Sequence, residues 1–292
     1  MGYVPTDARA QELIPELIPQ GLVCEEIQIP GDRRITLHGV LTYRKLQEPI
    51  ETHIPKTVLV YFQGNAGNPL MRLPVFHRLL MGPPIPGPSE IAPLDLAILA
   101  VAPRSYWKST HRSPTEAGLL SDYTHALNYA TERFPTSNIV LYGHSLGGAV
   151  SLCLTSRLRA EEYPTVKGHI LENPFASIPS MVKALYPQKW LPYHHLGPLA
   201  FDKWDALFAV RNASPDSLTA KLAPTTTMML SEHDELVPNV MGEALFEASA
   251  GLVTEEDGRR RVVKLRNALH ENAWQNRRWL TEMRKYMQAT GA

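Results

Sequence analysis

The sequence has only two cysteines among its 292 residues, Cys24 and Cys153. Both stand in apolar segments, which is typical of buried free thiols, and so few cysteines exclude a disulfide-stapled domain. The sequence also lacks an excess of charge, with 29 basic and 29 acidic residues, so its electrostatics do not favour nucleic acid as a partner. Its eleven histidines show none of the spacings of a zinc site, and we therefore predict no metal.

Long apolar runs are missing as well. No stretch reaches the roughly 18 consecutive apolar residues that a membrane-spanning helix needs. The N-terminal stretch lacks the basic start and apolar centre of a secretory signal, although Gly2 and Thr6 fit a short myristoylation pattern. We therefore expect no membrane span in this chain, with peripheral membrane association left open, and a cytoplasmic or membrane-peripheral location rather than a secreted one.

Apolar, β-branched segments recur along the chain and predict eight strands. The first two alternate in polarity and lie close together, as in a hairpin at a sheet edge, whereas most later ones are almost continuously apolar, as buried parallel strands are. The expected strands are 22–29, 35–43, 57–62, 96–102, 138–142, 167–172, 225–230 and 261–266. Helical patterns separate most of the later strands, so we predict an α/β fold with an eight-stranded, mostly parallel sheet and helices on both faces.

One helix start has a clear signature. Ser113, Pro114 and Glu116 match a capping box with proline at the first helical position. We therefore expect Ser113 to cap a helix that runs to about residue 134.

Two segments interrupt the alternation of strands and helices. The segment 81–93 is rich in proline and predicts an exposed loop. The segment 175–222 is long for a loop inside a compact domain and carries several large aromatic residues, which is typical of a functional insertion. We interpret residues 1–292 as one domain with a cap or lid at 175–222.

The strongest chemical signal is the segment IVLYGHSLGGAV at 139–150. It fits G-x-S-x-G around Ser145, between a predicted strand and a predicted helix, which is the context of a nucleophile elbow. A helix N-terminus beside the serine favours the negative charge that develops there during acyl transfer. The alternative is a tight strand–helix turn in which Ser145 only caps the helix.

A nucleophilic serine needs a base and an acid that orients the base. On this strand order the acid follows the serine and the histidine comes last. His270 is the only histidine after the last predicted strand, so we predict that it is the base. Asp234 is the favoured acid among Glu232, Asp234 and Glu235, and Glu172, at the end of the sixth strand, is the rival.

Stabilising an oxyanion requires two further donors. One is the backbone N–H of Leu146, the residue after the nucleophile. The other is expected from the loop YFQGNAGN after the third strand, where Gly64 and Gly67 let the backbone turn close to the substrate. We predict the N–H of Asn65 as this second donor.

Five ordered motifs together resemble the α/β-hydrolase superfamily, and more narrowly its Bem46-like branch, near the abhydrolase-domain-13 type. They are YFQGNAGN, YGHSLGGA, ENPFASIPSMV, HDELVP and LHENAW, and they extend from about Val58 to Trp274. The resemblance implies an α/β-hydrolase fold with a cap between strands 6 and 7. It also implies a triad of Ser145, Asp234 and His270, and an esterase, thioesterase or related acyl hydrolase that needs no metal or cofactor.

The chain departs from this family at two loops. Relatives usually have His-Gly where this chain has Gln63-Gly64, so Gln63 would have to replace the orienting hydrogen bonds of the histidine. Relatives carry DYRGYGKS where this chain has APRSYWKS, so we expect Trp107 to narrow the pocket. We expect Trp190 and Trp204 of the insertion to bind substrate as well. Relatives often carry an N-terminal membrane anchor, which leaves the location of this chain open.

The leading hypothesis is a serine hydrolase that cleaves a carboxylic ester or thioester of a small-molecule or acyl substrate through an acyl-enzyme. An amide or peptide hydrolase, or a natural-product tailoring enzyme, would use the same triad. A non-catalytic binding protein on a hydrolase fold is the alternative from another class, although such proteins have usually lost a triad residue.

Overall fold

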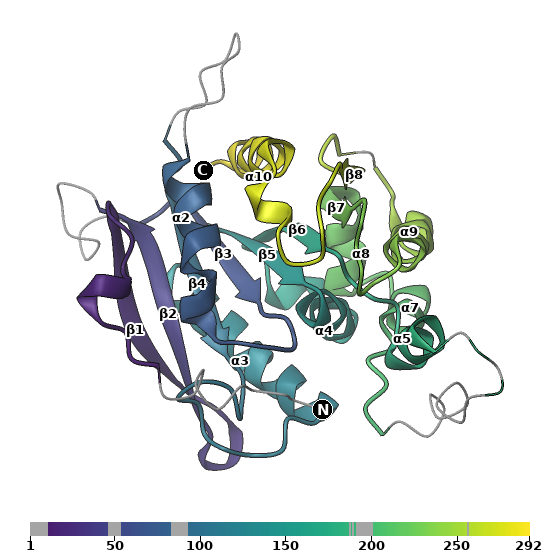
Figure 1. Cartoon of the computed structure of the whole chain (residues 1–292), viewed down its shortest axis with the longest axis horizontal. Helices are drawn as coiled ribbons and strands as arrows, with labels where there is room; N and C mark the ends of the chain where they lie inside the picture. The colour runs from purple at the N-terminus through teal and green to yellow at the C-terminus, as the bar shows by residue number, and fades with distance from the viewer. Residues whose placement is uncertain are drawn as a thin grey trace, which may run out of the picture.

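The computed structural model describes residues 11–45, 54–82, 93–186, 188, 190, 201–255 and 257–292. Its centre is an eight-stranded sheet in the order β1-β2-β4-β3-β5-β6-β7-β8 (Figure 1). The strands are β1 (Leu22–Pro30), β2 (Thr36–Arg44), β3 (Thr57–Phe62), β4 (Leu96–Ala102), β5 (Asn138–His144), β6 (Val166–Glu172), β7 (Thr226–Ser231) and β8 (Arg261–Leu265). The predicted sheet is confirmed, with strand ends within two residues of those expected.

The strand directions bring one set of loops together. β2 is antiparallel to β1 and to β4, as predicted for a hairpin at the edge, and every other neighbouring pair is parallel. The carboxyl ends of β3, β5, β6, β7 and β8 therefore lie along one edge, where doubly wound sheets bind their ligands. All of the predicted site residues that follow these strands meet there.

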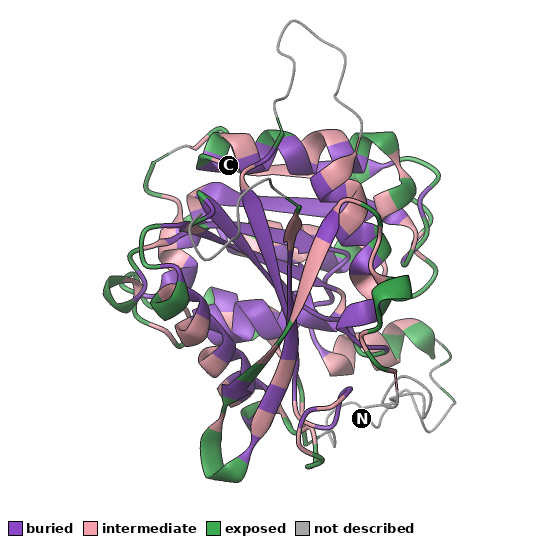
Figure 2. Cartoon of the chain, turned by 90° about the vertical axis from the view of Figure 1, so that its left-hand side faces the viewer, coloured by how far each residue is buried: buried purple, intermediate pink, exposed green. Residues whose placement is uncertain are grey.

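Helices cover both faces of the sheet. They are α2 (Leu73–Met81), α3 (Glu116–Arg133), α4 (Leu146–Thr155), α5 (Ile178–Leu185), α7 (Ala206–Arg211), α8 (Leu218–Leu222), α9 (Asn239–Ala248) and α10 (Arg277–Thr290). Two hydrophobic clusters follow from this arrangement, one beneath α3, α4, α7, α8 and α9 and one beneath α2 and α10. The strands form a buried layer between them (Figure 2). The fold class is thus confirmed as an α/β-hydrolase sheet.

The predicted cap segment divides into two parts. α7 and α8 belong to the helix layer, because Ala206, Val210, Leu218 and Leu222 are at most 1% exposed within its hydrophobic cluster. α7 contacts α4 and α9 of the same layer. Only the stretch before α7 is left as a candidate cap, and most of residues 187–200 lie outside the described residues. A cap at 175–222 therefore stays a prediction for its first part.

The start of α3 differs from the expected capping box. Thr115, not Ser113, is the N-cap, and its side chain accepts a hydrogen bond from the N–H of Gly118. Glu116 does not reach back to the cap residue. Its carboxylate accepts the backbone N–H groups of Lys203 and Trp204 instead, so it ties the returning insertion to the helix. Long-range hydrogen bonds have replaced the local ones that the motif predicts.

The remaining sequence predictions have mixed outcomes. Both cysteines are free thiols, and Cys24 is only half-buried whereas Cys153 is buried. Across the described ranges, none of the helices is both long enough and apolar enough to span a bilayer. The myristoylation pattern and most of the proline-rich loop at 81–93 lie outside the described residues. Peripheral membrane association stays a prediction.

Candidate active site

Ser145 lies at the turn between β5 and α4, where its backbone has φ 54° and ψ −119°. A positive φ is unfavourable for a residue with a side chain, and it persists where the surrounding structure enforces it, often at active sites. The Ser145 hydroxyl accepts no hydrogen bond from the first turn of α4. Its side chain therefore does not cap the helix, which was the alternative reading of this motif.

The glycines of the motif allow the turn to form. A Cβ on Gly147 would lie 1.9 Å from the carbonyl oxygen of Phe62, and one on Gly143 would lie 2.6 Å from the Cα of Gly148. Both contacts are with backbone atoms, which cannot move aside as a flexible side chain would. The sharp strand–helix turn is thus possible only with glycine at these two positions.

His270 and Asp234 come together from the loops after β8 and β7. The Nδ1 of His270 donates to the carboxylate of Asp234, with distances of 2.8 Å to Oδ2 and 3.0 Å to Oδ1. Both side chains are almost fully buried. The Asp234 Oδ1 also accepts the backbone N–H groups of Leu236 and Val237, so the carboxylate is fixed from two sides. The other ring nitrogen, Nε2, has no hydrogen-bond partner among the described residues.

The three rival carboxylates have other partners. Glu172 is 3% exposed and accepts hydrogen bonds from the Tyr142 hydroxyl at 2.8 Å and from the Trp279 indole. Burial raises the pKa of Glu172, so the structure disfavours its charged form. Glu232 and Glu235 accept backbone N–H groups from the loop after β8. Within the described residues, Asp234 is the only carboxylate that hydrogen-bonds the His270 ring.

The two residues predicted to supply the oxyanion donors lie on segments close to Ser145. Leu146 is the first residue of α4, so its N–H has no acceptor within the helix. The loop after β3 passes close by, since a Cβ on Gly64 would lie 3.7 Å from the Cβ of Ser145. The hydroxyl of Tyr106 donates to the carbonyl of Asn65 at 3.2 Å and fixes the next peptide. No acceptor for the Asn65 N–H is found in the described part of the chain.

Gln63 does not replace the hydrogen bonds of the family histidine. Its side chain is buried, and neither its Oε1 nor its Nε2 has a hydrogen-bond partner within the described residues. The loop is held instead by its backbone, because the N–H of Gln63 donates to the Tyr123 hydroxyl at 3.0 Å. The expectation that the Gln63 side chain orients this loop is therefore wrong.

One cluster near the site resembles a set of metal ligands. Single ligand atoms of His144, His270 and Glu271 lie within 4.8 Å of one another. The Arg72 guanidinium already occupies this space, donating to His144 Nδ1 at 3.0 Å and to Glu271 Oε2 at 2.8 Å. A divalent cation would face that positive charge and compete for the same lone pairs. The cluster does not fit a metal, and the absence of a metal or cofactor stays a prediction.

Curated relatives support the resemblance seen in the sequence. The chain is 32% identical to protein bem46 of Schizosaccharomyces pombe over 180 residues, which are 61% of this chain and 53% of that protein. It is 30% identical over 174 residues to the α/β-hydrolase domain-containing protein WAV2 of Arabidopsis thaliana, covering 58% and 49%. A lysophosphatidylserine lipase, ABHD12 of Danio rerio, is 29% identical over 146 residues, covering 49% and 37%. The chain spans about half the length of the first two relatives, and no family model matches it.

Solved structures agree on the fold. Carboxyl esterase 2 of the fungus Tuber melanosporum matches 96% of this chain and 89% of its own, with a TM-score of 0.64 at 14% identity. The esterase Pf2001 of Pyrococcus furiosus matches 95% of this chain and 94% of its own, with a TM-score of 0.62 at 13% identity.

The fold is that of an α/β-hydrolase, and the matched relatives support its resemblance to the Bem46-like branch. In this fold the three tryptophans predicted to bind substrate have different surroundings. Trp107 is 3% exposed, and its indole N–H donates to the carbonyl of Gln11 at 2.7 Å, so the N-terminal segment covers it. Trp204 is 5% exposed in the helix-layer core, whereas Trp190 is 80% exposed. A role for any of the three in substrate binding stays a prediction.

The sequence did not predict two buried polar residues that hydrogen-bond the backbone of His270. His144 is the variable residue inside the G-x-S-x-G motif, and Asn173 directly follows Glu172 at the end of β6. Both are 1% exposed and both hydrogen-bond the carbonyl of His270. Their only signal in the sequence was their place after a strand, because their partners come from a loop about 100 residues away.

Proposed function

We propose that this hydrolase cleaves carboxylic esters or thioesters through an acyl-enzyme on Ser145. The observation that carries the proposal is the strained Ser145 turn at the sheet edge that also holds the His270–Asp234 pair. Serine-type catalysis needs a nucleophile, a base within reach and an acid that orients the base. Relatives and fold neighbours that are named esterases or lipases support the same reaction class.

In the acylation step the Ser145 Oγ attacks the carbonyl carbon while the Nε2 of His270 takes its proton. Negative charge moves to the carbonyl oxygen, where the N–H groups of Leu146 and Asn65 stabilise it. The tetrahedral intermediate then collapses, the bond to the leaving group breaks, and His270 returns the proton to the departing alcohol or thiol. Asp234 holds the proton-bearing Nδ1 and stabilises the imidazolium.

In the deacylation step water attacks the acyl-enzyme and His270 again acts as the base. The second tetrahedral intermediate expels Ser145, which recovers its proton from His270, and the carboxylic acid leaves. No group outside the triad and the oxyanion donors is needed for this proton balance. The same residues would also cleave an amide, so substrate panels must include one.

A fluorophosphonate probe tests the nucleophile directly. We expect the parent protein to be labelled at Ser145 and the Ser145→Ala variant not to be labelled. Loss of the nucleophile alone lowers kcat by about 10⁶-fold in a well-studied serine protease, so turnover should fall to a residual level. A folded Ser145→Ala protein that hydrolyses esters as fast as the parent would disprove the mechanism.

A substrate panel then sorts the alternatives. p-Nitrophenyl esters from acetate to palmitate, an acyl thioester, a p-nitroanilide and lysophosphatidylserine cover the proposed and rival reactions. The last is included because some relatives are named lysophosphatidylserine lipases. Since one methylene in an apolar pocket changes binding by about 1–3 kcal/mol, kcat/KM should vary strongly along the ester series. Preference for the anilide over every ester would favour the amide hydrolase.

A further inference from the structure

The backbone carbonyl of His270 is held by two side chains that no triad mechanism requires. The Nε2 of His144 lies 3.2 Å from this oxygen, and the Nδ2 of Asn173 also lies 3.2 Å from it. A carbonyl oxygen only accepts, so both nitrogens must donate. These two residues end β5 and follow β6, so the carbonyl is bound to two neighbouring strand ends.

Arg72 fixes the proton of His144. A guanidinium has no acceptor, so its contact with Nδ1 at 3.0 Å makes that nitrogen the acceptor and leaves the proton on Nε2. Burial, together with the charges of Arg72 and His270, holds the pKa of His144 well below its usual value, so the ring stays neutral. Glu271 anchors the other side of the guanidinium at 2.8 Å. The histidine is therefore oriented as a donor to His270.

The amide of Asn173 is oriented just as tightly. Its Oδ1 accepts the backbone N–H of Ser231 at 2.8 Å, and its Nδ2 also donates to the Ser231 hydroxyl at 2.9 Å. A flipped amide would lose the hydrogen bonds with the Ser231 N–H and with the His270 carbonyl. Asn173 itself has φ 47°, in the left-handed region, which asparagine adopts more readily than most residues with a side chain.

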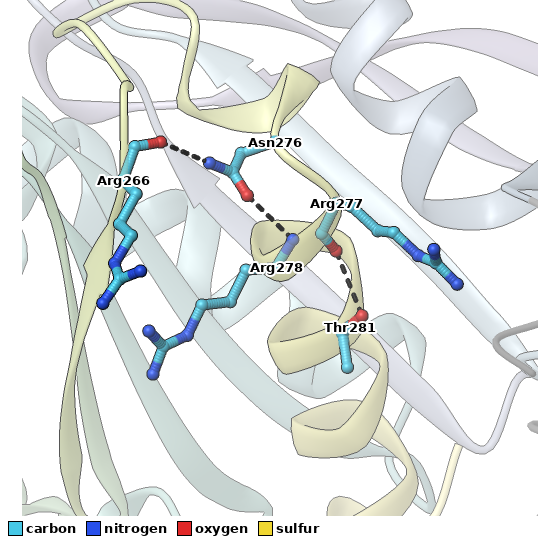
Figure 3. A pocket seen from close by; sticks show the side chains of 5 residues that line it. All are labelled: Arg266, Asn276, Arg277, Arg278 and Thr281. Atoms are coloured by element: carbon cyan, nitrogen blue, oxygen red, sulfur yellow. Dashed lines mark hydrogen bonds between the residues drawn. The ribbon is translucent and has the colours of Figure 1, made fainter. Parts of the chain in front are cut away.

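The backbone N–H of His270 and the ends of its loop are hydrogen-bonded as well. The N–H of His270 donates to Glu235 Oε2 at 3.0 Å. Asn276 closes the loop, because its Nδ2 donates to the carbonyl of Arg266 at 2.8 Å while its Oδ1 accepts the N–H of Arg278 at the start of α10 (Figure 3). The hydrogen bonds of His144 and Asn173 differ from these, because they join the His270 carbonyl to the ends of β5 and β6 beside Ser145.

We infer that His144 and Asn173 are positioning residues that fix the distance between nucleophile and base. His144 is covalently joined to Ser145 and hydrogen-bonded to His270, so it links the two reacting residues through one side chain. Asp234 orients the imidazole ring but does not tie it to the elbow. Misplacement of a catalytic group by about 1 Å can lower the rate by about 10²-fold. This inference rests on the proposed function and assigns a task to residues outside the triad.

The first test compares three substitutions at two buried histidines. His144→Gln keeps a donor at the same number of bonds from the backbone as Nε2, whereas His144→Leu removes it. His169→Leu is the matched control, since His169 is also buried at 1% exposure but hydrogen-bonds Ser151 on α4. For His144→Leu we expect kcat to fall by about 10- to 100-fold with KM changed less than about twofold. His144→Gln should recover most of kcat, and His169→Leu should change stability alone.

Burst kinetics with p-nitrophenyl acetate separate positioning from loss of folded protein. The burst amplitude counts active sites, and rates per site should drop equally for acylation and deacylation, because His270 serves both steps. Asn173→Gly, which accepts the positive φ without strain, should show the same pattern more weakly. Unchanged rates per site in both His144→Leu and Asn173→Gly would overturn the inference.

A measurement without turnover keeps this result independent of the proposed function. The proton between His270 Nδ1 and Asp234 gives a downfield NMR signal that His270→Gln should remove. We expect the signal to shift or broaden in His144→Leu and to return in His144→Gln. A folded parent protein that neither hydrolyses the ester nor reacts with the fluorophosphonate probe would refute the proposed hydrolase, whereas an unshifted signal in His144→Leu would refute the positioning role.

Discussion

Two acid–histidine pairs lie side by side at the carboxyl edge of the sheet, and their partners differ. Asp234 contacts the His270 Nδ1 at 2.8 Å, and the other ring nitrogen has no partner in the described part of the chain. Glu172 lies 3.9 Å from the His144 Nε2, but both ring nitrogens of His144 are already used, by Arg72 and by the His270 carbonyl. The rings are only 5.1 Å apart. Position at a strand end therefore does not single out the pair that we propose for catalysis. A ring nitrogen without a hydrogen-bond partner among the described residues does.

The largest expected effect comes from exchanging the two acids for amides. Asp234→Asn should lower kcat by about 10⁴-fold, because an amide stabilises the wrong histidine tautomer and cannot balance the imidazolium. Glu172→Gln keeps an acceptor for the Tyr142 and Trp279 donors, so kcat should stay within about tenfold of the parent. Steady-state kinetics on one ester compare the two. The reverse ranking would indicate that Glu172, at the end of β6, is the acid, and would contradict the contrast between the two pairs.

The same contrast applies to the two tryptophans of the insertion. Trp204 is buried in the helix-layer core, so Trp204→Ala should lower the free energy of unfolding by about 3–5 kcal/mol. Trp190 is mostly exposed, and Trp190→Ala should change stability by less than about 0.5 kcal/mol. Urea unfolding measures both. If Trp190→Ala changes the acyl-chain preference at unchanged stability, its predicted contact with substrate gains support; equal loss on every ester would argue against it.

A third buried histidine, His169, makes the free energy of unfolding depend on pH without taking part in the proposed reaction. Burial lowers the pKa of His169 to about 3. In the unfolded chain the pKa returns to about 6.5. The folded-state value is depressed, so the stability contribution is complete above the unfolded pKa and is lost as pH falls from about 6.5 toward 3. Between pH 7 and pH 5 this loss is about 2 kcal/mol.

Replacing His169 by glutamine removes that titration. The free energy of unfolding of His169→Gln should therefore fall about 2 kcal/mol less than that of the parent over the same pH interval, as urea titrations at each pH would show. An identical pH slope in the two proteins would mean that His169 binds a proton in the folded state.

The smallest expected effect concerns Gln63, whose amide has no partner within the described residues. A buried unpaired polar group costs about 1–3 kcal/mol, so Gln63→Met should raise the free energy of unfolding by about 1 kcal/mol. The oxyanion donors near it are backbone groups, and kcat should stay within a few-fold. A loss of stability in Gln63→Met would reveal a hydrogen-bond partner for the amide, such as a bound water.

Local patterns were enough to predict most of the fold. The eight strands followed from apolar runs, because a strand covered on both faces must be apolar along its whole length. The elbow followed from G-x-S-x-G, since backbone collisions at Gly143 and Gly147 exclude any other residue there. The location of His270 at the carboxyl edge of the sheet followed from its place after the last strand. These features depend on the residues of one short segment, so a single sequence is enough to predict them.

The tertiary structure decided which hydrogen-bond partners these side chains have. The motif at Ser113 predicted a local cap, but Glu116 is used by residues 203 and 204. The sequence favoured Asp234 over Glu172 from position alone, and in the folded chain Tyr142 and Trp279 hydrogen-bond Glu172 whereas His270 hydrogen-bonds Asp234. Gln63 was expected to orient a loop, and its amide has no hydrogen-bond partner among the described residues. The sequence alone determined which residues reach the sheet edge. Only the folded chain determined which of their hydrogen-bonding groups are satisfied there, because those partners come from segments far apart along the chain.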